Sequence, residues 1–283
     1  MPVRRVTVVG AGTMGNGIAH VFAQHGWGVT LVDVSRPALD RALETIGRNL
    51  DRQVKKGTLG EGDRDATLKR VVPAGDLDGV TDSALVVEAV IEEPGPKFDL
   101  FADLDRRLPP PAVLASNTSS ISITEIAART GHPERVVGMH FMNPVPVMPL
   151  VEVIRGLATS DATVQSVVRT VQELGKTPVE VSDYPGFVSN RVLMPMINEA
   201  IYCVMEGVAT PEAVDTVMKL GMHHPMGPLA LADLIGLDVC LAILNVLQHG
   251  LGDDKYRPCP LLRKMVAAGR LGRKSGRGFY EYA

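Results

Sequence analysis

The chain has 283 residues, 45% of them hydrophobic, and a net charge of −3 at pH 7. This length provides for one large domain or two ordinary ones, the balanced charge gives no indication of binding to nucleic acid or a membrane surface, and no apolar run approaches the ~18 residues of a membrane span. The three cysteines, Cys203, Cys240 and Cys259, fit neither a metal cluster nor a disulfide framework, so we expect no bound metal and a reducing, cytoplasmic location.

The first predicted element is a strand from Val6 to Val9, which begins so early that it leaves no room for a signal peptide. It leads into a Gly-x-Gly-x-x-Gly turn that opens an apolar-periodic helix: Gly10, Ala11, Gly12, Thr13, Met14 and Gly15. In a dinucleotide-binding unit the first glycine permits the tight turn, the second admits a pyrophosphate, and the third lets the helix pack closely on the strand. The helix N-terminus then attracts the phosphates.

A second predicted strand runs from Val29 to Asp33 and so ends in a carboxylate. This carboxylate lies about 20 residues beyond the glycines, where an acceptor for a ribose 2′-hydroxyl is expected. The pattern therefore predicts a nicotinamide dinucleotide site, and the alternative is a glycine-rich turn in another α/β fold. Asp33 repels a 2′-phosphate and favours NAD, whereas Arg36 could offset that repulsion, so NADP use remains an alternative.

Ser35 and Pro37 indicate the start of a long helix that continues to about Lys56. Four basic residues share one of its faces: Arg41, Arg48, Arg52 and Lys56. This basic stripe has two interpretations. It is either an ordinary solvated face, since acidic residues are interspersed, or a binding surface for a phosphorylated part of the substrate. Residues 56–76 are glycine-rich and charged, which predicts a loop with one short helix over 65–70.

Strands and helices alternate to about residue 182, which predicts a doubly wound α/β sheet of the Rossmann type. Further strands are predicted at 85–90, 113–115, 136–141, 150–154 and 179–181, and helices at 97–107, from the capping box at 122–125, and at 162–174. Ligands of such sheets bind at the carboxyl ends of the strands. Six candidate residues fall at that edge: Gly10, Asp33, Glu92, Asn117, Ser119 and His140.

Beyond Asp183 the periodicity is helical, with Gly or Pro at the breaks. This predicts a dinucleotide-binding domain over 1–183 followed by a smaller all-α domain over 184–283. Its helices are predicted at 188–207, 211–220, 229–234, 237–250 and 261–268, and one short strand at 278–280. The helix at 188–207 is apolar on most sides, which favours a subunit interface.

His140 ends an apolar strand at the ligand edge, and Glu152 lies on the next strand. The Pro-rich connection 143–149 could fold the two strands back on each other and bring imidazole and carboxylate together. A histidine at a strand end is often only structural, but beside a nicotinamide site this pair is suited to act as a base held in one tautomer.

Ser119 and Asn190 are uncharged polar candidates with two interpretations each. Ser119 either caps the following helix, which Ser120 or Ser122 can do instead, or binds substrate. Asn190 is either an ordinary helix cap or a buried amide whose partner is a substrate carbonyl.

Taken together, these motifs resemble the short-chain L-3-hydroxyacyl-CoA dehydrogenases, in particular the stand-alone bacterial 3-hydroxybutyryl-CoA dehydrogenases. The resemblance extends nearly from end to end, and no hydratase region is fused to the chain. Besides the glycine turn and Asp33, the matching segments are 116–120, 138–146, 150–153, 185–191, 225–228 and 272–280.

The resemblance implies that His140 is the catalytic base or acid, that Glu152 orients it, and that Ser119 and Asn190 bind the substrate. It implies that the cofactor is held by the glycine turn and by Asp33, Glu92, Lys97, Asn117, Ser119, Asn143 and Lys274. It further implies a coenzyme A contact at Lys56 and a second at Asn49, where the family has serine. Pro94-Gly95-Pro96, just before Lys97, is unusual for the family.

The function implied is the reversible oxidation of a short-chain L-3-hydroxyacyl-CoA, such as 3-hydroxybutyryl-CoA, to the 3-ketoacyl-CoA, here acetoacetyl-CoA, by a homodimer assembled through the C-terminal domain. A dehydrogenase for 3-hydroxyadipyl-CoA would keep every motif. A relative that acts on a free sugar acid would not need the basic stripe. A non-catalytic dinucleotide-binding protein would need none of the four residues His140, Glu152, Ser119 and Asn190 at these positions.

Overall fold

The computed structural model describes residues 4–80 and 82–282. The chain divides into two compact units, unit 1 from Met1 to Asp183 and unit 2 from Tyr184 to Ala283. Unit 1 holds the sheet, and unit 2 is helical.

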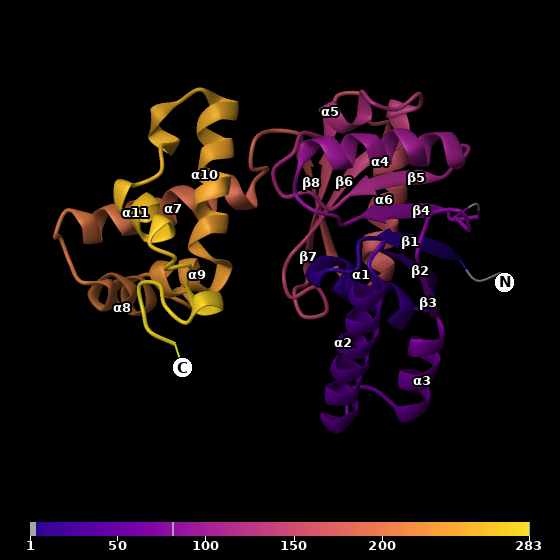
Figure 1. Ribbon diagram of the computed structural model, residues 1–283, viewed down its shortest axis with the longest axis horizontal. Helices are drawn as coiled ribbons and strands as arrows, with labels where there is room; N and C mark the ends of the chain where they lie inside the picture. The colour runs from indigo at the N-terminus through magenta and orange to yellow at the C-terminus, as the bar shows by residue number, and fades with distance from the viewer. Residues whose placement is uncertain (1–3, 81, 283) are drawn as a thin grey trace. The chain divides into compact units, whose positions relative to one another are not determined.

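Unit 1 is built on one eight-stranded sheet in the order β3-β2-β1-β4-β5-β6-β7-β8 (Figure 1). The strands are β1 (Arg5–Val9), β2 (Gly28–Val32), β3 (Val71–Ala74), β4 (Leu85–Glu88), β5 (Val113–Ser116), β6 (Val136–Phe141), β7 (Leu150–Arg155) and β8 (Thr177–Ser182). All neighbours are parallel except β6 and β7. The central strands β4, β5 and β6 are buried along their whole length, as strands covered by helices on both faces must be. The predicted doubly wound sheet is confirmed.

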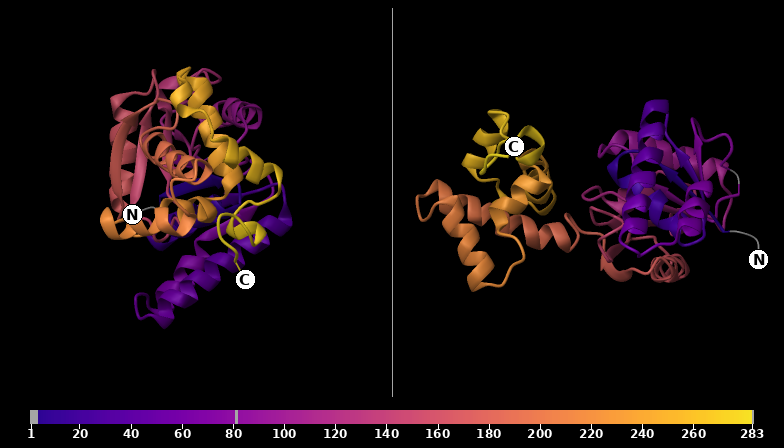
Figure 2. Two further views of the ribbon diagram at one scale, coloured as in Figure 1. Left: turned by 90° about the vertical axis from the view of Figure 1, so that its left-hand side faces the viewer. Right: turned by 90° about the horizontal axis from the view of Figure 1, so that it is seen from below.

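The helices of unit 1 begin where the sequence provides capping groups. Ser35, Ser122 and Ser160 each accept a hydrogen bond from a backbone N–H in the first turn of the helix that follows. The helices are α1 (Thr13–Gln24), α2 (Arg36–Lys55), α3 (Glu61–Lys69), α4 (Pro94–Arg107), α5 (Ile123–Ala127), the 3-10 turn η1 (Pro133–Arg135) and α6 (Asp161–Glu173). The helices α2 and α3 lie side by side and project beyond the sheet (Figures 1 and 2).

The segment 56–76 differs from the prediction. Its helix, α3, begins at Glu61, and it is followed by an unpredicted strand, β3, which pairs with β2 from Val71 opposite Val29. The β3 strand is short, lies at the sheet edge and contains Pro73, which a central strand would not tolerate. Its pattern of apolar residues was therefore too weak to identify it.

Unit 2 contains α7 (Ser189–Met205), α8 (Pro211–Gly221), α9 (Pro228–Ile235), α10 (Leu237–Leu251), η2 (Asp254–Tyr256), α11 (Pro260–Ala267) and η3 (Arg273–Ser275). Its own apolar core joins α7, α9, α10 and α11 and includes Ile197, Leu244 and Leu262. The strand predicted at 278–280 is wrong. Arg277 forms only isolated bridges to Gly272 and Glu281, because the backbone N–H groups of Phe279 and Tyr280 donate to the Asp233 carboxylate instead.

Within the described residues no single helix has the length and apolarity to cross a membrane, although α9 and α10 together, with a 97° bend between them, meet those criteria by length and composition alone.

His20 on α1 is fully buried, and its Nδ1 has no hydrogen-bond partner among the described residues. Burial lowers the pKa of His20 to about 4 from an ordinary value of 6.5. The folded state therefore binds this proton less readily than the unfolded state. The resulting loss of stability begins as the pH falls below 6.5 and is complete below about 4.

We therefore expect the free energy of unfolding to fall by up to about 3 kcal/mol across this pH window because of His20. In His20→Gln, which carries no titrating group, that part of the decrease should disappear in urea titrations at pH 7, 5.5 and 4.5. The exposed His249→Gln, in unit 2, serves as the control and should keep the wild-type dependence. Equal pH dependence in the wild type and His20→Gln would refute the assignment.

Candidate active site

The glycine turn joins β1 to α1 at the carboxyl edge of the sheet. Gly10 has a φ of +103°, and a side chain there would collide with the carbonyl oxygen of Ala89, while one at Gly15 would collide with the carbonyl of Gly10. At Gly12, the N-cap of α1, nothing lies within 4 Å of the position of a Cβ. The outer glycines are thus required by the fold, and the middle one leaves the helix N-terminus open for phosphate groups, as a dinucleotide requires.

Asp33 follows β2 and is held by two backbone groups. Its Oδ2 accepts from the Ala11 N–H and its Oδ1 from the Ser35 N–H, each at 2.8 Å. Arg36, which could have offset the charge of Asp33, forms an exposed ion pair with Asp40 at 3.0 Å. The carboxylate is therefore fixed at the sheet edge, while the nearby cation is engaged on its own helix.

The antiparallel pairing of β6 and β7 places His140 directly opposite Glu152. The His140 Nδ1 lies 2.8 Å from the Glu152 Oε2, and the two residues are only 8% and 2% exposed. The predicted approach of imidazole and carboxylate is confirmed. A buried carboxylate of this kind requires a partner, and the imidazole provides one.

The connection between β6 and β7 is held in place by Lys176, a residue that the sequence analysis did not single out. Its ammonium group donates to the carbonyl oxygens of Val145 and Met148, each at 2.7 Å. Burial lowers the pKa of Lys176. Asn143, in the same connection, is exposed.

The segment after β5 connects the candidate residues to one another. The Asn117 side-chain oxygen accepts from the N–H of Phe141, the residue after His140, at 2.9 Å. Ser119 donates to the Glu92 Oε1 from its N–H at 2.8 Å and from its hydroxyl at 3.1 Å. Ser122, not Ser119, caps α5, so the capping interpretation of Ser119 is wrong.

Lys97 is 1% exposed, and its ammonium group lies between two carboxylates. It is 2.5 Å from Glu88, which the sequence analysis did not single out, and 3.2 Å from Glu92. A carboxylate at the end of an otherwise apolar, buried strand was the signal that could have identified Glu88.

A cavity of about 710 Å³ in unit 1 brings part of the basic stripe together with the β6–β7 connection. Asn49, Arg52 and Lys56 from α2 line it, together with Pro146 and Lys176. Arg41 and Arg48 do not line this cavity, so the stripe separates into two halves.

Two predicted site residues, Asn190 and Lys274, belong to unit 2. Asn190 lies one residue inside α7, whose N-cap is Val188, and it is 8% exposed, so its interpretation as the helix cap is wrong. Lys274 lies on η3, where its ammonium group pairs with Asp238 at 2.6 Å.

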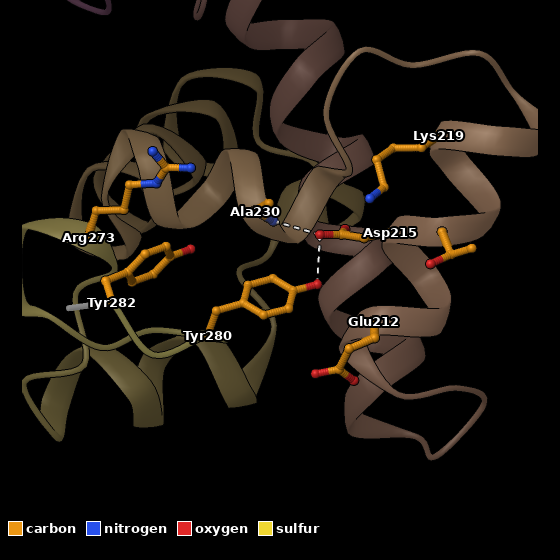
Figure 3. Close-up of a pocket in the computed structure, with 8 residues that line it drawn as sticks. Glu212, Asp215, Lys219, Ala230, Arg273, Tyr280 and Tyr282 are labelled. Carbon is orange, nitrogen blue, oxygen red and sulfur yellow. Dashed lines mark hydrogen bonds between the residues drawn. The ribbon is translucent and has the colours of Figure 1, made fainter.

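A second cavity, of about 310 Å³, lies within unit 2 between α8 and the C-terminal tail (Figure 3). Asp215 accepts there from the hydroxyl of Tyr280 and from the N–H groups of Leu229 and Ala230 at the start of α9. Burial, and then Asp215, raise the pKa of Tyr280. These hydrogen bonds give the buried Asp215 a structural role, because they attach the C-terminal tail and the start of α9 to α8.

Comparison with known proteins agrees with this geometry. The family model "3-hydroxyacyl-CoA dehydrogenase, NAD binding domain" matches residues 5–184, and "3-hydroxyacyl-CoA dehydrogenase, C-terminal domain" matches residues 186–282. The chain is 57% identical to a probable 3-hydroxybutyryl-CoA dehydrogenase of Bacillus subtilis, over 100% of this chain and 98% of that one. It is 55% identical to a 3-hydroxybutyryl-CoA dehydrogenase of Bradyrhizobium diazoefficiens, over 99% and 96%.

The fold is also similar to a crystal structure of the (S)-3-hydroxybutyryl-CoA dehydrogenase from Ralstonia eutropha. The TM-score is 0.96 at 50% identity, and 99% of each chain is covered. An NAD-binding sheet with a buried histidine–carboxylate pair near its ligand edge defines an NAD-dependent oxidoreductase. The chain belongs to the 3-hydroxyacyl-CoA dehydrogenase family.

Asp33 offers a direct test of the cofactor site. In Asp33→Asn, we expect NADH binding to weaken about tenfold or more, because a charged hydrogen-bond acceptor contributes about 1.5–3 kcal/mol. We also expect the preference for NADH over NADPH to shrink, because the charge that repels a 2′-phosphate is removed. Both constants can be measured from the fluorescence of the bound reduced nucleotide.

Asp40→Asn is the matched control, because it removes a carboxylate from the same helix region and releases Arg36 without changing Asp33. It should leave NADH affinity unchanged. If Asp33→Asn bound both nucleotides as the wild type does, the cofactor role of Asp33 would be refuted.

Proposed function

We propose that this protein catalyses the reversible, NAD-dependent oxidation of L-3-hydroxybutyryl-CoA to acetoacetyl-CoA. The observation that carries the proposal is the buried contact of His140 with Glu152 near the ligand edge of an NAD-binding sheet. The names of relatives more than 50% identical over nearly the whole chain support the four-carbon acyl group.

The chemistry of the pair follows from its hydrogen bond. An ionised Glu152 can only accept, so the His140 Nδ1 carries the proton and leaves Nε2 as the basic nitrogen. In oxidation, Nε2 takes the proton of the substrate hydroxyl, and Glu152 stabilises the imidazolium that forms. In reduction, the imidazolium returns that proton to the developing alkoxide. Bound nicotinamide supplies the hydride acceptor or donor.

We propose the remaining site roles from the resemblance together with the geometry. The glycine turn holds the pyrophosphate and Asp33 the adenosine ribose, which favours NAD over NADP, while Glu92, Lys97, Asn117, Ser119, Asn143 and Lys274 complete the cofactor site. Ser119 and Asn190 bind the substrate around its reacting oxygens. Two exposed apolar side chains that follow β2 and β4, Val34 and Ile91, are suited to contact the adenine.

Asn49 and Lys56 are proposed to bind coenzyme A. They share a cavity with Arg52, and this concentration of positive charge is suited to the phosphates of the nucleotide part of coenzyme A. A relative acting on a free sugar acid would have no use for it.

We further propose that residues 1–183 form the NAD-binding domain and that residues 184–283 form a domain for substrate binding and homodimer formation in the cytoplasm. The dimer is supported by large apolar side chains exposed on unit 2, among them Val192, Val217, Leu220 and Met222. The three free cysteines agree with a reducing compartment.

The proposed reaction predicts rapid oxidation of NADH with acetoacetyl-CoA, followed spectrophotometrically, and a rate that falls as the acyl chain lengthens. His140→Ala should lower turnover by about 10²–10⁴-fold with little change in NADH affinity, because general acid–base catalysis contributes that much. Glu152→Gln should lower turnover in the same direction, because a neutral amide neither fixes the tautomer nor stabilises the imidazolium.

Turnover with dicarboxylic 3-ketoacyl-CoA but not with acetoacetyl-CoA would identify the substrate as one of the 3-hydroxyadipyl-CoA class. The proposed mechanism would be unchanged. Near-normal turnover by His140→Ala would refute the assignment of the base. A protein that binds NADH but reduces no thioester would be a dinucleotide-binding protein without this activity.

Lys56→Glu should raise the KM for acetoacetyl-CoA about tenfold or more while leaving kcat nearly unchanged, because it reverses a charge at the coenzyme A nucleotide and far from the acyl group. Acetoacetyl-pantetheine, which lacks the nucleotide, should be reduced equally by the variant and the wild type. Arg41→Glu is the matched control, since it makes the same reversal outside the cavity. An unchanged KM in Lys56→Glu would rule out this binding surface.

A further inference from the structure

Glu88 has no role in the proposed function, yet it is the centre of a buried hydrogen-bond network that leads to residues proposed for the cofactor site. It is the last residue of β4 and 0% exposed. Its Oε1 accepts from the Val90 N–H at 2.7 Å and from the Lys97 ammonium at 2.5 Å, and its Oε2 accepts from the Ser116 hydroxyl at 2.6 Å. A carboxylate at this depth is tolerated only because all three donors are present.

Lys97 connects this buried carboxylate to a more exposed one. Its ammonium group pairs with Glu88 and also with Glu92, whose side chain is 39% exposed. Because Glu88 holds the Lys97 side chain in this buried position, the ammonium group stays within ion-pair distance of Glu92. Burial by itself would raise the Glu92 pKa, but Lys97 and hydrogen bonds from Thr118 and Ser119 outweigh it and lower the pKa.

Glu92 in turn accepts hydrogen bonds from the hydroxyl groups of the segment after β5. Its Oε1 accepts from the hydroxyls of Thr118 at 2.7 Å and of Ser119 and Ser120 at 3.1 Å. An ionised carboxylate cannot donate, so in each of these hydrogen bonds the hydroxyl is the donor. While the Ser119 hydroxyl donates its one proton to Glu92, its oxygen can only accept from a further group.

We propose that Glu88 and Lys97 are positioning residues whose buried ion pair holds Glu92 as an anionic acceptor, so that Ser119 presents its oxygen as a hydrogen-bond acceptor to the bound ligand. The last step rests on the proposed function, in which Ser119 contacts cofactor and substrate. The matching ligand groups are donors, either an N–H or O–H of the dinucleotide or the hydroxyl of a 3-hydroxyacyl thioester.

The protonation state of Glu92 depends on one cation, the ammonium group of Lys97. In this network Lys97 from α4 and Glu88 from β4 are the charged groups, and the segment after β5 contributes only hydroxyl and N–H groups. Without Lys97, Glu92 would bind a proton more readily. A protonated Glu92 can donate to Ser119, which would reverse the polarity of that hydroxyl.

The test removes both buried charges together in Glu88→Gln/Lys97→Met, with folding checked by circular dichroism. Titration of Glu92 is followed by NMR with 13C-carboxyl-labelled glutamate, the signal being assigned by its loss in Glu92→Gln. We expect the Glu92 midpoint to lie below the ordinary glutamate range in the wild type and to be higher in the double variant, because the cation that lowers it is gone. Should the double variant not fold, Glu88→Gln/Lys97→Gln keeps a hydrogen-bonding amide at both positions and serves the same test.

Activity provides the second measurement. In the reductive direction His140 acts in its protonated form, so its own titration limits the alkaline side of the pH profile. If the ligand donor lies on the dinucleotide, kcat/KM for acetoacetyl-CoA reduction by the double variant should fall about tenfold per pH unit below the raised Glu92 midpoint. If the donor is the hydroxyl of L-3-hydroxybutyryl-CoA, this profile should stay as in the wild type, because the ketone of acetoacetyl-CoA can only accept. A parallel loss of NADH affinity would place the donor on the cofactor, and a loss confined to the KM of L-3-hydroxybutyryl-CoA would place it on the substrate.

Asp103→Asn/Arg107→Met is the matched control, because it removes an exposed ion pair from the same helix α4. It should leave the Glu92 midpoint and the pH profile unchanged. The proposal is overturned if the Glu92 midpoint does not move in the double variant, or if it moves while binding and pH profile stay as in the wild type. A wild-type protein inactive toward acetoacetyl-CoA would refute the proposed function, whereas the NMR titration and NADH affinity would still decide this inference.

Discussion

The contact between His140 and Glu152 depends on one change of direction in an otherwise parallel sheet. The strand β7 runs against β6, and this register places the two side chains opposite each other. A shift of one residue would turn Glu152 to the other face of the sheet. The contacts of Lys176 with the connection, and of Asn117 with the residue after His140, stabilise that register from two sides. The geometry of the histidine–carboxylate pair is therefore a property of the strand pairing.

The parts of the structure that could be predicted from the sequence depend on interactions between residues close together in the chain. The glycine turn and Asp33 follow from conformational demands within about 25 residues, and the capping serines determine where their helices begin. The pairing of His140 with Glu152 was predictable because a short, proline-rich connection separates two apolar strands.

The parts that escaped prediction depend on contacts between distant segments. The strand β3 is recognisable only by its pairing with β2, and Glu88 only by the three groups that converge on it. Lys97 was named as a site residue by resemblance, and no sequence pattern reveals that it is buried between two carboxylates. The segment 278–280 was predicted as a strand because it contains two aromatic residues, Phe279 and Tyr280. The hydrogen bonds from their N–H groups to Asp233 are not recognisable from the sequence.

The two hydrogen bonds of Asp33 also restrict how cofactor use can change in evolution. The carboxylate proposed to hold the adenosine ribose also ties the glycine turn, through Ala11, to the start of α2, through Ser35. A lineage that replaced this aspartate to accept a 2′-phosphate would at the same time release the loop proposed to hold the pyrophosphate. A switch in cofactor therefore needs a second substitution that restores the loop, and intermediates with only the first would bind either nucleotide poorly.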